Sequence, residues 1–127
     1  MRELPRDEIS KVPTLRSFSD VAGIAREEAF DGNGLWAGFV RIEKGSTSGW
    51  HTHPAWESVA HIVSGSVRLD YGPGGAKSVE AGPGDWLYEP AGIVHRKAAL
   101  ESDVLAVVFR YGHGPIVQNV DGPEEEG

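Results

Sequence analysis

Short apolar segments, separated by turn residues, recur about every ten residues from Leu35 onwards. In the segment SVRLDY the residues Val67, Leu69 and Tyr71 alternate with polar ones, and they share one face of a strand because side chains two apart point to the same side. Glycine and proline clusters end each segment, and no helical periodicity competes with this pattern. The expected strands are residues 35–42, 48–53, 57–63, 66–71, 77–81, 86–89, 93–99 and 104–111. Many short strands of this kind predict an all-β sandwich or closed barrel.

The two ends of the chain differ from this middle part. Residues 1–22 mix charges and prolines, which predicts an extended N-terminal arm with one helical turn near Ser19–Val21. Residues 23–30 have helix-favouring residue types, but the segment is short and we expect an edge strand. We therefore expect one barrel domain over residues 23–118 and a flexible acidic tail over residues 119–127.

Composition excludes several classes of function. The 127 residues include no cysteine, so disulfides, thiolate catalysis and cysteine-ligated metal sites are absent. The net charge of −7 lacks the basic patch of a nucleic-acid-binding protein. No apolar run approaches the roughly 20 residues that span a bilayer, and no signal peptide is recognisable. We expect an acidic cytoplasmic protein whose partner is a small molecule rather than nucleic acid or membrane.

The segment GSTSGWHTHPAWESVAHIVSG, residues 45–65, contains a candidate metal site. His51 and His53 are two residues apart, so on a strand they share a face at a spacing of roughly 6.5 Å. Glu57 follows four residues after His53. The three side chains fit part of a metal-binding shell, or alternatively a pair of exposed histidines that bind nothing.

A second segment, GDWLYEPAGIVH, supplies a possible further ligand. His95 follows a strand and the turn formed by Pro90, Ala91 and Gly92, and a rigid turn fixes the angle at which the next strand begins. The alternative is an ordinary hairpin whose histidine packs in the interior.

Together, the two segments resemble the two motifs of the cupin superfamily, within residues 35–111. The first family motif is Gly, five residues, His-x-His, three or four residues, Glu, six residues and Gly. The second is Gly, five residues, Pro-x-Gly, two residues, His, three residues and Asn. The matching residues are Gly45, His51, His53 and Glu57 in the first motif and Gly84, Pro90, Gly92 and His95 in the second.

The sequence departs from the family pattern at two places. Seven residues, not six, separate Glu57 from Gly65, so the family's carboxylate position falls on Glu57 when counted from His53 and on Ser58 when counted from Gly65. We favour Glu57 with a one-residue bulge after Pro54, because a serine hydroxyl is a poor ligand; with Ser58 the site would have three histidines. The second departure, Ala99 in place of Asn, affects a position that is not a ligand in the family.

The resemblance implies a jelly-roll β-barrel with a metal ion inside its wider end. The implied ligands are His51, His53, Glu57 and His95. Imidazole and carboxylate ligands suit a divalent transition metal ion, Fe, Mn, Ni, Co or Zn, without selecting one of them. Related small cupins are often dimers, and we expect a homodimer in which the N-terminal arm adds a strand to a second subunit's sheet.

Several other side chains near the motifs are considered for a functional role. Glu89, just before the Pro-x-Gly turn, either faces solvent or lies near the metal, where it would be a candidate catalytic residue that orients or deprotonates a substrate. His61 is interpreted as a core histidine with its hydrogen bonds satisfied, and His113 as an exposed loop residue. Strand parity places Trp86 on the face opposite to Glu89.

The function that these features favour is a metal-dependent enzyme, dioxygenase-like, that acts on a small organic molecule. A metal-dependent isomerase, lyase or decarboxylase is an alternative within the same class. A non-catalytic cupin that binds or senses a small molecule is the alternative from another class, because one fold hosts many functions.

Overall fold

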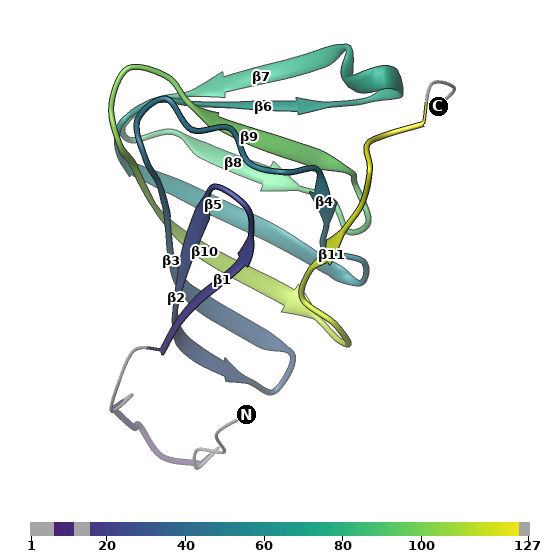
Figure 1. The fold of residues 1–127 in the computed structure, drawn as a ribbon. Coiled ribbons are helices and arrows are strands. Elements are labelled where there is room, and N and C mark those ends of the chain that lie inside the picture. Colours follow the sequence, from purple (N-terminus) through teal and green to yellow (C-terminus); the bar gives the residue numbers. More distant parts are fainter. Residues whose placement is uncertain (1–6, 12–15, 125–127) are drawn as a thin grey trace.

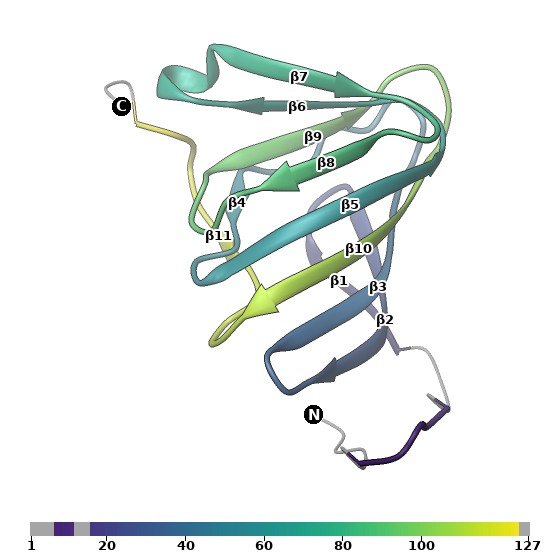
Figure 2. The same ribbon diagram turned by 180° about the vertical axis from the view of Figure 1, so that it is seen from behind.

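A computed structural model describes residues 7–11 and 16–124 of the chain. These residues form two antiparallel sheets that face each other (Figures 1 and 2). The six-stranded sheet has the order β1 (Arg16–Val21), β2 (Ile24–Gly32), β3 (Leu35–Ile42), β10 (Val104–Gly112), β5 (Trp56–Ser64) and β8 (Trp86–Glu89). The five-stranded sheet has the order β11 (Gln118–Asn119), β4 (His51–Thr52), β9 (His95–Ala99), β6 (Val67–Tyr71) and β7 (Lys77–Ala81).

The architecture is the predicted all-β jelly roll. The described residues contain no α-helix, and their one helical element is the short 3₁₀ turn η1 (Pro73–Gly75). None of their helices has the length and apolar character needed to cross a bilayer. Turn chemistry determines the hairpins: Asn33 and Gly34 both have positive φ, as the tight turn between β2 and β3 requires.

The strand predictions hold with three corrections at the edges. Residues 48–53 contribute only the short strand β4, because Pro54 ends it. The predicted helical turn near Ser19–Val21 is wrong, since Arg16–Val21 form β1 on the edge of the chain's own sheet. The strand predicted at residues 23–30 exists as β2, but it lies between β1 and β3 and is not an edge strand. Of the predicted arm, residues 1–6 and 12–15 lie outside the described residues.

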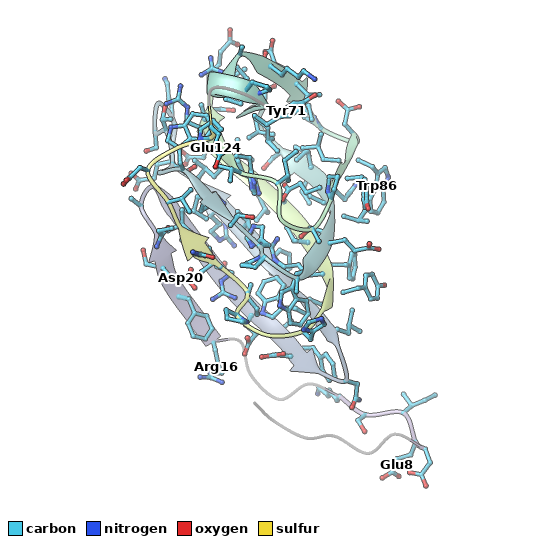
Figure 3. All side chains as sticks on the ribbon, turned by 90° about the vertical axis from the view of Figure 1, so that its right-hand side faces the viewer. Glu8, Arg16, Asp20, Tyr71, Trp86 and Glu124 are labelled. Atoms are coloured by element: carbon cyan, nitrogen blue, oxygen red, sulfur yellow. The ribbon has the colours of Figure 1, made fainter. Side chains whose placement is uncertain are left out.

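The C-terminal segment closes one end of the barrel. Carbonyl oxygens of Gly114 and Ile116 accept hydrogen bonds from the side chains of Trp56 and His53. Further along, the amide of Val120 donates to a carbonyl beside β4 and the carbonyl of Glu124 accepts from the η1 turn. Figure 3 shows Glu124 at the same end as Tyr71. Within the predicted flexible tail, Asn119, Val120 and Glu124 are therefore held by hydrogen bonds, and residues 125–127 lie outside the described residues.

The inner face of the six-stranded sheet is apolar at one end and polar at the other. Strand alternation places buried side chains in rows that cross β3, β10, β5 and β8. Two apolar rows are Val40, Ala106 and Ile62, and then Val108, Ala60 and Leu87. The next row is Trp36, Arg110, Ser58 and Glu89. This polar row marks the end of the barrel at which the histidines of the other sheet lie.

Candidate metal centre

Three histidines from two strands converge inside the barrel. His51 on β4 lies directly opposite His95 on β9 in the antiparallel pair, and His53 follows β4. Their ring centroids are 4.3 Å apart for His51 and His95, 5.2 Å for His51 and His53, and 5.4 Å for His53 and His95. All three are buried, and one nitrogen of each lies within 4.8 Å of the other two. The three histidines can bind one metal ion.

Backbone carbonyls fix the orientation of all three rings. A carbonyl oxygen only accepts, so each Nδ1 in such a contact carries the proton and each Nε2 carries the free lone pair. This arrangement is the one that metal-binding histidines commonly use to set their tautomer. The bonds run from Nδ1 of His51 to Gly49 O (2.9 Å), of His53 to Ile116 O (2.6 Å) and of His95 to Ile93 O (3.1 Å).

Burial keeps the rings neutral. Desolvation, with the nearby charge of His95, lowers the pKa of His51 to about 3. Desolvation and the charge of Arg110 lower the pKa of His53 to about 2, and burial also lowers the pKa of His95. Neutral imidazole is the form that coordinates metal ions.

The Pro90–Gly92 turn joins the two halves of the cluster. Its Gly92 amide donates to the carbonyl of His53 at 3.1 Å, and Gly92 has φ +79, a conformation that glycine adopts without strain. The turn therefore sets the start of β9, and with it His95, relative to His53.

The structure does not bring Glu57 to the histidines. Glu57 is exposed on the outer face of β5, whereas Ser58 is buried and faces the interior. The one-residue irregularity of β5 lies between Ile62 and Ser64, where its register against β10 shifts, and not after Pro54. Because strand parity is uninterrupted from Glu57 to Ile62, the inward position falls on Ser58. The ligand prediction for Glu57 is thus corrected, and Ser58 takes the motif's inward position.

Glu89 supplies the carboxylate that Ser58 lacks. It is the cross-strand neighbour of Ser58, and its side chain is 5% exposed. Its Oε1 lies 3.4 Å from Nε2 of His95, and its Oε2 lies 3.2 Å from Nζ of Lys97. Burial would raise the pKa of Glu89, but the positive charges of Lys97 and Arg110 outweigh that effect and lower the pKa below its ordinary value. The side chain is therefore a carboxylate at neutral pH.

The free atoms of these side chains are those expected of a metal site. Nε2 of His53, Nε2 of His95 and Oε1 of Glu89 are buried without a hydrogen-bond partner among the described residues. Buried polar atoms without partners are costly, and two lone-pair atoms 3.4 Å apart repel unless a cation or a proton lies between them. A divalent ion would satisfy all three atoms at once, and nitrogen with carboxylate oxygen suits Fe, Mn, Ni, Co or Zn.

Three buried cations at this end, Lys97, Arg110 and Arg26, were not predicted. Lys97 follows His95 by two residues and faces the same way, and Arg110 lies on the inner face of β10. Strand parity with His95 could have placed Lys97 inside the barrel. The alternation of inward and outward positions along the strand VVFRY could have done the same for Arg110. His61, by contrast, is not a core residue: it lies on the outer face, half-buried, with its ring 4.4 Å from that of Trp86.

A mostly apolar groove reaches the cluster from outside. Its volume is about 190 Å³, and it lies between β8 and the strands β6 and β7. Glu89 and His95 form its inner end, and Leu69, Tyr71, Leu87 and Ile93 are among its apolar walls. A small organic molecule with an apolar body fits such a groove.

Comparison with known proteins identifies the architecture. The family described as "Cupin domain" matches residues 38–110, and no curated protein matches the sequence significantly. KdgF from Halomonas sp. has a similar structure, with 21% identity, a TM-score of 0.64, and coverage of 78% of this chain and 89% of that one. The DMSP lyase DddQ from Ruegeria pomeroyi has 24% identity and a TM-score of 0.62, over 70% of this chain but only 44% of that one. An oxalate oxidase solved with the substrate analogue glycolate has 21% identity, a TM-score of 0.65, and coverage of 76% and 55%. Likeness at these identities concerns the fold.

Proposed function

Because the chain belongs to the cupin domain family, we propose that it is a metal-dependent enzyme that acts on a small organic molecule. The observation that carries the proposal is the set of buried, unpartnered atoms, His53 Nε2, His95 Nε2 and Glu89 Oε1, that face one another. His51, His53, His95 and Glu89 would hold one divalent transition metal ion.

Glu89 replaces the predicted ligand Glu57 in this proposal. Residues opposite each other on neighbouring strands present side chains to the same space, so the carboxylate of Glu89 reaches the region that Ser58 faces. The ion pair with Lys97 holds Oε2 and leaves Oε1 directed at His95. The catalytic role predicted for Glu89 stays a prediction, and its place supports direct contact with the ion.

The residues around the cluster would orient the metal ligands and limit the entry of water. A bound divalent ion of this kind polarises a substrate oxygen or activates dioxygen. Lys97 positions Glu89, and the three backbone carbonyls hold the imidazoles in one orientation. The segment around Ile116 covers the cluster on one side and limits the entry of water.

The reaction class that we propose is dioxygenase-like, with an isomerase, lyase or decarboxylase as the alternative. Among proteins of similar structure, one is named as an oxidase and another as a lyase, so both classes keep support. A non-catalytic cupin that binds a small molecule is the second candidate function, favoured by the mostly apolar groove, which fits a ligand whether or not the ligand is turned over. Uptake of dioxygen by Fe(II)-loaded protein with its substrate supports the oxygenase, and anaerobic turnover supports the alternative.

Metal content tests the site itself. The purified wild-type protein, reloaded with Fe(II), Mn(II), Ni(II), Co(II) or Zn(II) and desalted, is expected to retain about one ion per chain by mass spectrometry. His51→Ala and His95→Ala should lose it, and Glu89→Gln should lower the affinity roughly tenfold to a hundredfold. Glu57→Gln is the matched control and should bind like wild type. Full retention of the metal ion in both histidine variants would refute the proposal. Loss of the ion in Glu57→Gln with retention in Glu89→Gln would show that Glu57, and not Glu89, is the carboxylate ligand.

A homodimer is part of the proposal, and it has support from the outer face of the six-stranded sheet. Across β3, β10, β5 and β8, two neighbouring rows on this face contain no charged side chain: Ala37, Phe109, Val59 and Tyr88, and then Phe39, Val107, His61 and Trp86. The second row meets a charge only on β2, at Glu27. Trp86 is 61% exposed and points away from the barrel in Figure 3. An uncharged patch on an acidic protein is typical of a contact surface, and a second copy offers the same uncharged patch.

A further inference from the structure

Arg110 is the buried cation of the barrel that has no carboxylate partner. It is 2% exposed, and its guanidinium donates one hydrogen bond, of 2.7 Å, to the hydroxyl of Ser58. Its Nε has no partner, and none of the ion pairs among the described residues includes it. The other two cations of this end are paired, Lys97 with Glu89 and Arg26 with Asp20.

An unpaired buried charge needs a reason. A hydroxyl group satisfies a donor but does not neutralise a guanidinium, and leaving a charge buried without a counter-ion costs several kcal/mol. Arg110 also lies over the ring of Trp36, with 5.3 Å between its Cζ and the ring centroid, which offsets only part of that cost. Burial and the charge of Arg26 lower the pKa of Arg110 to about 10, against the opposite effect of Glu89. The side chain still carries its charge at neutral pH.

The guanidinium borders the same cavity as the histidines. Two of the three histidines, His51 and His53, line it with Arg110, and Ile116 covers it. The other charged side chains of its lining are Lys97, Arg26 and Asp20. Its free volume of about 20 Å³ admits a group of the size of one water molecule. One oxygen atom of a ligand's charged group fits this space, whereas the groove of about 190 Å³ beside Glu89 and His95 is large enough for a ligand's body.

The balance of charge at this end of the barrel indicates the charge of the ligand's polar end. Glu89 and Asp20 offset Lys97 and Arg26. The buried Glu28, which accepts a hydrogen bond from Trp36, is offset by Arg16 at 3.7 Å. The neutral histidines add no charge, so a divalent ion and Arg110 together leave the cavity strongly positive. This local charge contrasts with the net charge of −7 for the whole chain.

We propose that Arg110 is the anion-binding residue of this site, and that the ligand is a small organic carboxylate whose charged group contacts both Arg110 and the metal ion. The inference rests on the proposed metal site. A guanidinium is suited to this task because its fork of donors matches the two oxygens of a carboxylate. Ser58, at the motif's inward position, then serves to hold Arg110 rather than to bind the metal.

Anion binding to the Co(II)-loaded protein tests the inference. Acetate and glycolate are titrated while the visible absorption of Co(II) is recorded, with acetamide as the uncharged probe. Both carboxylates should shift the spectrum of wild type, and acetamide should not. In Arg110→Met, which keeps the contact with Trp36 but removes the charge, the dissociation constant should rise at least about tenfold. Arg41→Met is the matched control, because Arg41 is exposed on the outer face of the same sheet.

The outcomes separate the two proposals. If wild type retains no Co(II), the proposed metal site fails. If wild type and Arg110→Met retain Co(II) equally but bind carboxylates equally, only the role of Arg110 is overturned. Binding of acetamide as tight as acetate, or of phosphate in place of both carboxylates, would overturn the ligand class. Should Arg110→Met not fold, Arg110→Lys, which keeps the charge but not the fork, is expected to fold and to weaken carboxylate binding, and unchanged binding there would refute the inference.

Discussion

The ion pair between Glu89 and Lys97 gives the sharpest prediction of stability. Their side chains are 5% and 7% exposed, and 3.2 Å separates Oε2 from Nζ. At an effective dielectric constant of about 20, Coulomb's law gives an attraction of about 5 kcal/mol at that distance. Much of this attraction offsets the desolvation of the two charges, so the pair contributes little net stability although neither partner tolerates the loss of the other.

Lys97→Met in the metal-free protein removes one charge and keeps a side chain of similar length. The Glu89 carboxylate is then buried without its main partner, and it must either stay charged there or take up a proton. We expect a loss of about 3–5 kcal/mol in the free energy of unfolding. For 127 residues the unfolding entropy is about 0.27 kcal/mol/K, so the melting temperature should fall by roughly 11–19 °C.

Thermal and urea unfolding in the presence of a chelator measure this effect, with Glu89→Leu and the double variant completing a cycle. The double variant Glu89→Leu/Lys97→Met should recover most of the loss, because an apolar pair of similar volume carries no desolvation cost. A single Lys97→Met variant within about 0.5 kcal/mol of wild type would refute the reasoning. So would a double variant as unstable as the sum of the two single variants.

Three further predictions concern turns, pH and assembly. A Cβ at Gly65 would lie 2.2 Å from the carbonyl oxygen of Asp103, whereas a Cβ at Gly45 would meet nothing within 4 Å. Because both glycines have a similar positive φ, Gly65→Ala should lower the free energy of unfolding in urea by at least about 2 kcal/mol more than Gly45→Ala. Burial would raise the pKa of Asp70, but hydrogen bonds from two arginines lower it, so its stabilisation is present above pH 4 and is lost as the pH falls through the lowered folded-state value. Asp70→Asn should therefore cost about 1 kcal/mol at pH 7 and little near pH 2, and an equal difference at both values would contradict this. Light scattering after size exclusion should show a dimer at micromolar concentration that Trp86→Lys converts to monomer; a monomeric wild type would remove the assembly proposal.

Local pattern determined most of the fold. Alternation and turn residues are local properties, and they specify β3, β7 and β8 to the residue. The same locality explains the errors, because β1 and β11 are strands only by pairing with a neighbour. Arg16–Val21 has no strong apolar alternation of its own and is held by β2. Gln118–Asn119 is a strand because it pairs with β4.

The candidate site divides in the same way. The spacing of His51 and His53 and the turn before His95 could be recognised in the sequence, since each depends on a few neighbouring residues. The carboxylate could not be assigned, because a shift of one residue in a strand reverses its faces, and only the pairing of β5 with β8 and β10 places Ser58 inward and Glu57 outward. Glu89, Lys97 and Arg110 come from three strands. The contact of Lys97 with Glu89 exists only after the two sheets have closed, and that of Arg110 with Ser58 only after β10 has paired with β5. The sequence by itself thus specified three histidines as candidate metal ligands, and the tertiary structure decided which carboxylate lies beside them and which cation faces them.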